Sequence, residues 1–355
     1  MNKTVIIKTG INSSIFVLTV ILFFIIAEVI MQINSKEKNL IDTLSECVRE
    51  SSDENMGLEF IPNSECTFKG TQVKINSQGL RDYEYKLEKQ DNVFRIITLG
   101  DSYTFGWGVE LNESYSKLIE SSLNENSDKK YEIINFGTPS HNTIQEARLL
   151  EIKAIAYKPD LIIIGYTSGD PECYWKFCSD ELKAATYNAF EKSFSIPTDH
   201  ITKERLLQRS LFLRFISNKY DIILHRLNIR KIDDDNVIIK LHYKNSATWK
   251  SVQESFRKIS KIAKENNAEV LIVVFPEIDF LSSDYILSDV SKQVIEEADK
   301  NGFNTLDLFP YFVEEEPRSL MVTPGDDGHD GHPNAKAHKI AADAVYNFMK
   351  KEEII

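Results

Sequence analysis

The chain has 355 residues, about twice the length of a typical domain, so it holds one large domain with appendages or two domains. Apolar residues make up 42% of it and charged residues 27%, values that exclude a disordered, collagen-like or polytopic membrane protein. Acidic residues outnumber Lys and Arg by 54 to 42, for a formal charge of -12, and this charge disfavours nucleic acid as a partner.

An apolar stretch near the N-terminus predicts a membrane anchor. It runs from Ile15 to Ile33 and is close to the roughly 20 residues that a membrane-spanning helix needs. Lys3 and Lys8 precede it, which favours a cytoplasmic N-terminus and an extracytoplasmic location for the rest of the chain. A cleaved signal peptide is the alternative, but no Ala-x-Ala-like cleavage site follows. We therefore expect residues 1–35 to form one transmembrane helix, a single-pass anchor that is not cleaved.

All four cysteines lie beyond the anchor and form two local pairs. Cys47–Cys66 and Cys173–Cys178 are therefore the expected disulfides among three possible connectivities. Four reduced thiols are the alternative. Neither pair has the two-residue spacing of a zinc knuckle, so zinc is not expected here.

Beyond the anchor, a polar segment leads into a regular alternation of strands and helices. Residues 36–92 are rich in Asn, Ser and Glu without sustained periodicity, and we interpret them as a stalk and lead-in segment. The expected strands are 94–99, 131–136, 161–165, 270–275 and, more weakly, 305–308. The expected helices are 115–123, 144–157, 251–266, 290–300 and 335–350. Such alternation predicts a parallel sheet covered on both faces, with ligands bound at the carboxyl ends of its strands.

The segment from about 173 to 249 breaks this alternation. It is charged, aromatic and partly helical. We interpret it as an insertion that could roof a site at the sheet edge.

Two polar segments carry the candidate chemistry. The first expected strand runs directly into Gly100-Asp-Ser102, which places the hydroxyl of Ser102 in the turn between a strand and a helix. The second segment is Asp326-Asp-Gly-His-Asp-Gly-His332, just before the last helix. A serine hydroxyl becomes a good nucleophile when a histidine, oriented by a carboxylate, accepts its proton. The two segments together supply all three groups.

Aromatic residues follow the serine. Tyr103, Phe105 and Trp107 are expected to pack beneath the turn, with an acyl or sugar platform as the alternative. His141 is a second candidate site residue, because it follows the segment that ends at Ser140; a hydrogen-bonded structural histidine is the other interpretation.

Three sequence blocks resemble those of the SGNH (GDSL-type) hydrolase family. Gly100-Asp-Ser102, Asn135-Phe-Gly-Thr-Pro-Ser140 and His332-Pro-Asn334 look like its first, second and fifth blocks. The resemblance implies a flavodoxin-like three-layer α/β/α sandwich with a parallel sheet, here an SGNH hydrolase-like domain over residues 93–351. It also implies that Ser102 attacks an ester carbonyl while His332 serves as the general base.

The loop before the last helix departs from the family pattern. In most of the family an aspartate precedes the histidine by three residues, and here that position is His329. We assign the carboxylate to Asp330, because alternate residues of an extended loop face the same way; the polysaccharide O-acetyltransferase branch similarly uses an Asp-x-His pair. Asp326 with His329 has the usual spacing without the following Pro-Asn and is the alternative acid and base. A divalent cation in this loop is a further alternative, although the spacings match no common metal site.

The oxyanion donors depart as well. The glycine of the second block is replaced by Ser140, whose main-chain N–H can still donate, at a higher cost if its backbone is left-handed. The third block, normally Gly-x-x-x-Asn-Asp, is Gly165-Tyr-Thr-Ser-Gly-Asp170, so Gly169 replaces the oxyanion-binding asparagine. Losing one such donor slows turnover by ~10²–10³-fold unless Ser168, Asn142 or the insertion substitutes. The expected donors are the main-chain N–H groups of Ser102, Ser140 and Gly169.

The sequence therefore predicts a membrane-anchored serine esterase or acetylhydrolase acting on short acyl esters, such as O-acetyl groups of a surface glycan. The expected partners are an ester-bearing small molecule or glycan and the membrane, with no nucleic acid, cofactor or metal. A polysaccharide O-acetyltransferase of the same fold is the closest alternative. A catalytically weak glycan-binding protein is the other, because the asparagine of the third block is missing.

Overall fold

The computed structural model describes residues 46–68, 70–125, 127–173, 178–191, 236–322 and 330–355, with residues 19, 22–24 and 26. Most of the expected anchor and much of the insertion lie outside these ranges. Within the described part of the chain, no helix has both the length and the apolar character needed to cross a membrane. The chain divides into two compact units, and the sheet belongs to the one formed by Leu40–Lys192 and Asp233–Ile355.

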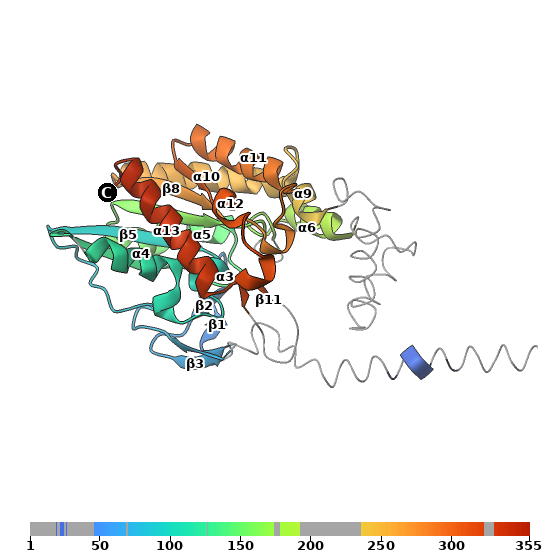
Figure 1. Ribbon diagram of the computed structural model, residues 1–355, viewed down its shortest axis with the longest axis horizontal. Coiled ribbons are helices and arrows are strands. Elements are labelled where there is room, and N and C mark those ends of the chain that lie inside the picture. Colours follow the sequence, from blue (N-terminus) through green and yellow to red (C-terminus); the bar gives the residue numbers. More distant parts are fainter. Residues whose placement is uncertain are drawn as a thin grey trace, which may run out of the picture. The chain divides into compact units, whose positions relative to one another are not determined.

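A five-stranded parallel sheet forms the centre of this unit (Figure 1). Its strands are β5 (Val93–Gly100), β6 (Lys130–Asn135), β7 (Leu161–Tyr166), β8 (Glu269–Val274) and β9 (Asn304–Asp307). The spatial order is β6-β5-β7-β8-β9, and each pairing is parallel. This is the flavodoxin-like strand order, and the expected strands are confirmed to within one residue at each end.

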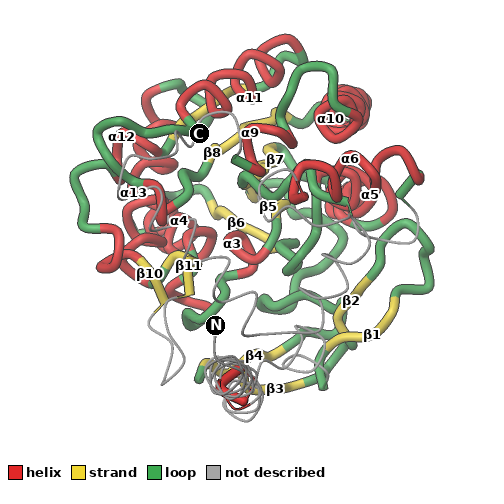
Figure 2. Tube along the Cα trace, turned by 90° about the vertical axis from the view of Figure 1, so that its right-hand side faces the viewer, coloured by secondary structure: helices red, strands yellow, loops and turns green. Residues whose placement is uncertain are grey.

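Helices cover both faces of the sheet, which makes a three-layer α/β/α sandwich (Figure 2). On one face lie α5 (Thr143–Ile152), α10 (Ala247–Glu265) and α11 (Ser288–Lys300); on the other lie α4 (Tyr115–Asn124) and α13 (Ala335–Lys351). Alternating residues of each strand point to the two faces, so the sheet contributes to two separate hydrophobic clusters. The predicted parallel α/β fold is therefore confirmed.

Two expected helices have different ends in the structure. The helix predicted over 144–157 stops at Ile152, because Lys153 leaves the helical region with a φ of -140° and a 3₁₀ turn over Ala154–Tyr157 follows. The helix predicted over 251–266 begins at Ala247 instead, because the side chain of Ser246 caps it by accepting from the main-chain N–H of Trp249.

Further elements lie in the connections between the main strands and helices. The helices are α3 (Ser102–Phe105), α6 (Asp180–Glu191), α9 (Val237–Leu241) and α12 (Phe309–Phe312). The 3₁₀ turns are Leu111–Glu113, Ile278–Phe280 and Pro317–Leu320. The short strands β10 (Met321–Val322) and β11 (Asp330–Pro333) pair antiparallel.

The lead-in segment is folded from residue 46 onward. It carries the antiparallel pairs β1 (Val48–Glu50) with β2 (Leu58–Phe60) and β3 (Glu65–Phe68) with β4 (Thr71–Lys74). Apolar side chains of these pairs form a small cluster with Phe105 of α3, whose ring stacks on that of Phe60 at 5.3 Å between centroids. The lead-in segment therefore packs directly against the helix that begins with Ser102.

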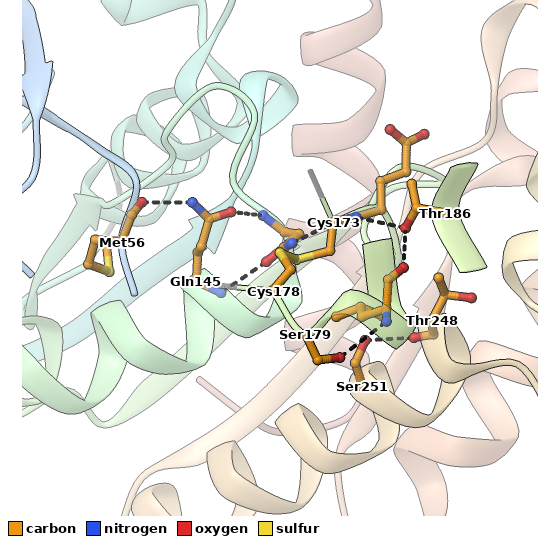
Figure 3. The surroundings of a disulfide bond; sticks show 11 residues. Met56, Gln145, Cys173, Cys178, Ser179, Thr186, Thr248 and Ser251 are labelled. Atoms are coloured by element: carbon orange, nitrogen blue, oxygen red, sulfur yellow. Dashed lines mark hydrogen bonds between the residues drawn. A yellow bond between two sulfur atoms is a disulfide. The ribbon is translucent and has the colours of Figure 1, made fainter. Parts of the chain in front are cut away.

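Both expected disulfides are present. Cys47–Cys66 joins the two lead-in strand pairs, and Cys173–Cys178 lies among α5, α6 and α10 (Figure 3). Next to the second disulfide, the hydroxyl of Thr186 in α6 accepts from the main-chain N–H of Cys173 at 3.1 Å. A cavity of about 660 Å³ opens beside Cys178 between these three helices.

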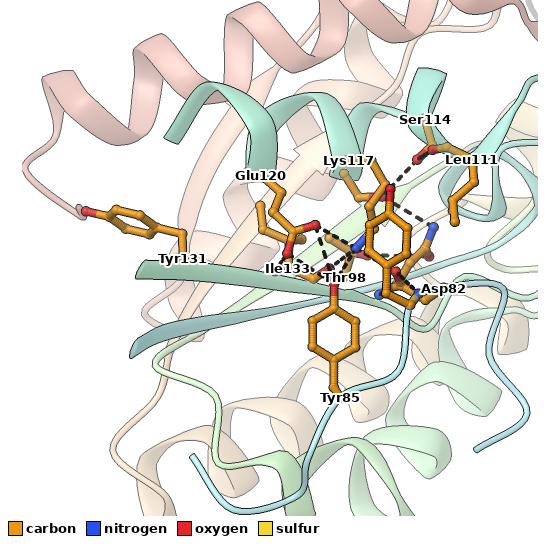
Figure 4. Close-up of polar contacts among 12 residues, drawn as sticks. Asp82, Tyr85, Thr98, Leu111, Ser114, Lys117, Glu120, Tyr131 and Ile133 are labelled. Carbon is orange, nitrogen blue, oxygen red and sulfur yellow. Dashed lines mark hydrogen bonds and ion pairs between the residues drawn. The ribbon is translucent and has the colours of Figure 1, made fainter. Parts of the chain in front are cut away.

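A buried lysine ties the lead-in segment to the sheet domain (Figure 4). The side chain of Lys117 in α4 is only 3% exposed, and its Nζ lies 2.7 Å from Asp82 Oδ1 and 2.9 Å from Glu120 Oε2. The ammonium also donates to the hydroxyl of Tyr85 at 2.8 Å. The other oxygen of Asp82 accepts from the main-chain N–H of Asn135 at 2.6 Å, at the end of β6. One cation therefore joins the lead-in segment, α4 and β6.

Removing this cation should destabilise the fold. Lys117→Met leaves the buried carboxylate of Asp82 and the partly buried one of Glu120 without their cation, and we expect the free energy of unfolding to fall by about 3–5 kcal/mol. Lys261→Met is the matched control, because Lys261 is an exposed α10 residue whose nearest ion-pair oxygen is 3.9 Å away. The control should change stability by about 0.5 kcal/mol or less. Urea unfolding of both variants measures the difference, and equal losses would contradict the role given to Lys117.

Candidate active site

The turn after β5 positions Ser102. β5 ends at Gly100, whose φ of 153° suits glycine, and a Cβ there would lie 2.1 Å from Thr104 Oγ1. Asp101 caps α3 by accepting from the main-chain N–H of Tyr103 at 2.8 Å. Ser102 is therefore the first residue of α3, at the carboxyl end of the central strand β5, and it is 9% exposed.

The structure brings Ser102, His332 and Asp330 together. His332 Nε2 lies 2.8 Å from Ser102 Oγ, and His332 Nδ1 lies 2.5 Å from Asp330 Oδ1. The carboxylate accepts the Nδ1 proton, so Nε2 is left to accept the proton of the serine hydroxyl. The three groups stand in the order that serine acyl transfer requires.

The short strand β11 explains how two residues so close in sequence can pair. Asp330 and His332 are alternate residues of an extended backbone, so their side chains point to the same side. Burial alone would raise the pKa of the Asp330 carboxyl, but hydrogen bonds from His332 and Trp107 and the nearby imidazole hold it well below its ordinary value. Asp330 is therefore a carboxylate at neutral pH.

Aromatic side chains pack around the imidazole. The indole of Trp107 stacks on the ring of His332, with 4.7 Å between centroids and 15° between planes. Its Nε1 donates to Asp330 Oδ2 at 3.1 Å. Tyr103 approaches the same loop, and its hydroxyl donates to the carbonyl of Gly331 at 3.4 Å. Phe105 is packed beneath the turn, as the first of the two interpretations has it, whereas Trp107 and Tyr103 contact the loop that carries His332.

A buried polar network joins the nucleophile turn to the loop after β7. The hydroxyl of Thr167 donates to Asp101 Oδ2 at 2.9 Å, and its main-chain N–H donates to Asp170 Oδ2 at 2.6 Å. Asp170 also accepts from the hydroxyl of Thr143 in α5 at 3.0 Å. Burial raises the pKa of the carboxyls of Asp170 and the neighbouring Glu146. Repulsion from Asp101 raises the pKa of Asp170 further, and repulsion from Asp170 does the same for Glu146. This network ties the loop that contains Gly169 to α5 and to the turn that contains Asp101 and Ser102.

The two side chains considered as substitutes for the missing asparagine are already engaged. The hydroxyl of Ser168 donates to Glu277. The amide of Asn142 donates to the carbonyl of Glu172 at 2.7 Å, and its oxygen caps α5 by accepting from the main-chain N–H of Gln145 at 3.1 Å. Neither is therefore available without breaking a native hydrogen bond.

Main-chain N–H groups remain as the candidate oxyanion donors. Ser140 has a φ of 63°, in the left-handed region where glycine is favoured, so the backbone here keeps the conformation that suits a glycine. The main-chain N–H groups of Ser102, Ser140 and Gly169 donate to no acceptor within the described part of the chain. All three are therefore free to donate to an oxyanion. A Cβ added at Gly169 would meet only Thr167 Oγ1 at 3.8 Å, so the position has room for a side chain.

His141 and Glu277 also lie near the site. His141 is buried, its Nε2 lies 3.3 Å from the carbonyl of Leu58, and burial lowers its pKa to about 4. It therefore stands apart from the hydrogen-bonded group of three. Glu277 follows β8 at the carboxyl edge and has its pKa raised by burial. Sequence reasoning missed Glu277, although a carboxylate just after a central strand is a signal that could have identified it.

The alternative acid and base, Asp326 and His329, lie outside the described residues. The metal alternative for their loop is untested for the same reason. Across the described ranges, no group of three or more His, Cys, Asp or Glu side chains could hold a metal ion.

The chain matches no protein-family model and no curated protein. Solved structures similar to it include TesA, at 13% identity and a TM-score of 0.41, with 72% of this chain and 98% of TesA covered. The esterase EstA from Pseudoalteromonas sp. has 14% identity and a TM-score of 0.41, with 75% and 100% covered. The acetylxylan esterase Axe2 from Geobacillus stearothermophilus has 14% identity and a TM-score of 0.41, with 72% and 93% covered.

Proposed function

We propose that the protein is a serine hydrolase that cleaves short acyl esters, with O-acetyl groups of a glycan as the substrate class. One observation carries the proposal: at the carboxyl end of β5, Asp330 is hydrogen-bonded to His332, and His332 is hydrogen-bonded to Ser102. The Asp-x-His spacing, which resembles that of the polysaccharide O-acetyltransferase branch, supports the choice of substrate.

The proposed reaction proceeds through an acyl-enzyme. Ser102 Oγ attacks the ester carbonyl while His332 Nε2 takes the hydroxyl proton, and Asp330 stabilises the resulting imidazolium. Main-chain N–H groups of Ser102 and Ser140 donate to the oxyanion. The imidazolium then returns the proton to the departing alcohol. Water next attacks the acyl-serine with His332 as the base, which releases the acid and restores the free hydroxyl.

An O-acetyltransferase is the second candidate, and the same Asp330-x-His332 geometry favours it. In that reaction a sugar hydroxyl replaces water in the second step. Acetylated oligosaccharide, rather than free acetate, is then the product when an acetyl donor and an oligosaccharide acceptor are supplied together.

An activated serine should react with a fluorophosphonate probe. We expect the chain from residue 36 onward to be labelled, and labelling to vanish in Ser102→Ala and His332→Ala, because the probe reacts with a serine whose base accepts its proton. Ser168→Ala is the matched control, since that hydroxyl donates to Glu277 and should leave labelling intact. Mass spectrometry of the labelled peptide gives the site. A folded protein that takes up no probe would favour the glycan-binding alternative.

Restoring the missing donor should accelerate the reaction. Gly169→Asn places an amide where the structure has room, and we expect kcat for p-nitrophenyl acetate to rise by about 10-fold or more. Gly169→Ala adds the Cβ without the amide and should leave kcat near the wild-type value. Steady-state hydrolysis of the two variants decides the matter. Equal rates in both would show that position 169 does not contact the oxyanion.

We also propose that the apolar stretch over 15–33 tethers the hydrolase to a membrane, with the sheet domain on the extracytoplasmic side. The support is its length and the positive residues before it. The full chain should stay with the membrane fraction after alkaline carbonate extraction, and a chain that begins at residue 36 should not. Release of the full chain by carbonate would overturn the tether.

A further inference from the structure

We infer that Trp107 is a positioning residue for the Asp330–His332 pair and that Arg81 fixes the turn that carries it; this inference rests on the proposed function. The starting point is the short spacing between acid and base. Both side chains come from the four-residue strand β11, and the two donors that this strand supplies, the main-chain N–H and Nδ1 of His332, both reach Asp330 Oδ1. A contact from another element is therefore needed to hold the carboxylate plane.

The indole supplies that contact at the carboxylate oxygen that does not face His332. Asp330 Oδ1 accepts from His332 Nδ1, and Asp330 Oδ2 accepts from Trp107 Nε1 at 3.1 Å. Two donors that come from different directions fix the rotation of the carboxyl group about its last bond. With the indole bound to Oδ2, Asp330 Oδ1 is held toward His332 Nδ1, where it can accept the imidazole proton.

The same indole also fixes the imidazole. The rings of Trp107 and His332 are nearly parallel, 15° apart, and their centroids are 4.7 Å from each other. This flat contact restricts rotation of the imidazole about its own side-chain bonds. Trp107 therefore contacts both members of the pair, one by a hydrogen bond and the other by stacking.

Arg81 holds the turn that carries the indole. Its guanidinium donates to the carbonyls of Gly106 at 2.6 Å, Phe105 at 3.2 Å and Val109 at 2.7 Å, on both sides of Trp107. The residue is 3% exposed and its charge lies 4.9 Å from the centre of the Phe105 ring. Burial lowers its pKa to about 10, so it remains protonated at neutral pH.

The indole also contacts an aromatic ring of the lead-in segment. The ring of Phe68 in β3 meets it edge-on, with 4.1 Å between centroids. The main-chain N–H of Trp107 donates to the carbonyl of Ser102 at 3.1 Å. The nucleophile and the group that orients the carboxylate therefore belong to one short turn, and Arg81 and Phe68 hold this turn from the lead-in segment.

The test removes the indole N–H and keeps a ring. We expect Trp107→Phe to lower kcat for p-nitrophenyl acetate about 10-fold with KM unchanged, and Trp107→Leu, which also lacks the stack, to lower it about 100-fold. Trp249→Phe, which changes a buried α10 tryptophan on the other side of the sheet, is the matched control and should leave kcat and KM unchanged.

A second readout separates this inference from the proposed function. In protein labelled with ¹⁵N-histidine, the Nδ1–H resonance of His332, assigned with His332→Gln, should be lost or broadened in Trp107→Phe and kept in Trp249→Phe. This result does not depend on any activity. An unchanged resonance and an unchanged kcat in Trp107→Phe would overturn the positioning role. A wild-type chain without esterase activity that still shows the resonance change would overturn the proposed function alone.

Discussion

The hydrogen bond between His332 Nε2 and Ser102 Oγ joins residues 230 positions apart, and the rest of the structure can be understood from what this bond requires. Ser102 is placed by the end of β5, while His332 is placed by β11 and the start of α13. Their separation depends on the register of the parallel sheet and on the packing of α13 against α4. A contact between residues so far apart in the sequence forms only when all three layers of the sandwich have folded together.

The carboxyl groups near the site have different protonation states, because their surroundings shift their pKa values in opposite directions. Asp330 is held as a carboxylate by donors from His332 and Trp107. Asp170 and Glu146 lie deeper, where burial and repulsion from neighbouring carboxylates favour the protonated form. Carboxyl groups within one small region therefore differ in their contacts: Asp330 accepts from His332, and Asp170 accepts from Thr143 and Thr167.

The fold and the candidate triad were predictable because both leave short local signals. Apolar runs mark the buried strands, and Gly100 before Ser102 marks the turn that follows β5. The contacts that hold the site were not predictable. Arg81, Asp82 and Lys117 bind partners that are close in space but far away in the sequence, and such contacts leave no periodic pattern. The engagement of Ser168 and Asn142 is of the same kind: the sequence shows the residues but not their partners. Where the sequence departs from the pattern of the family that it resembles, at Asp330 and Gly169, only the structure shows whether neighbouring groups adapt.

The strand geometry of β11 limits how this loop can change over evolution. Because Asp330 and His332 share one side of an extended backbone, insertion of a single residue between them would turn the carboxylate to the opposite side. An inserted residue would therefore break the pairing of Asp330 with His332 unless the strand gave way to another backbone conformation, so this loop tolerates a point substitution more readily than a change of length.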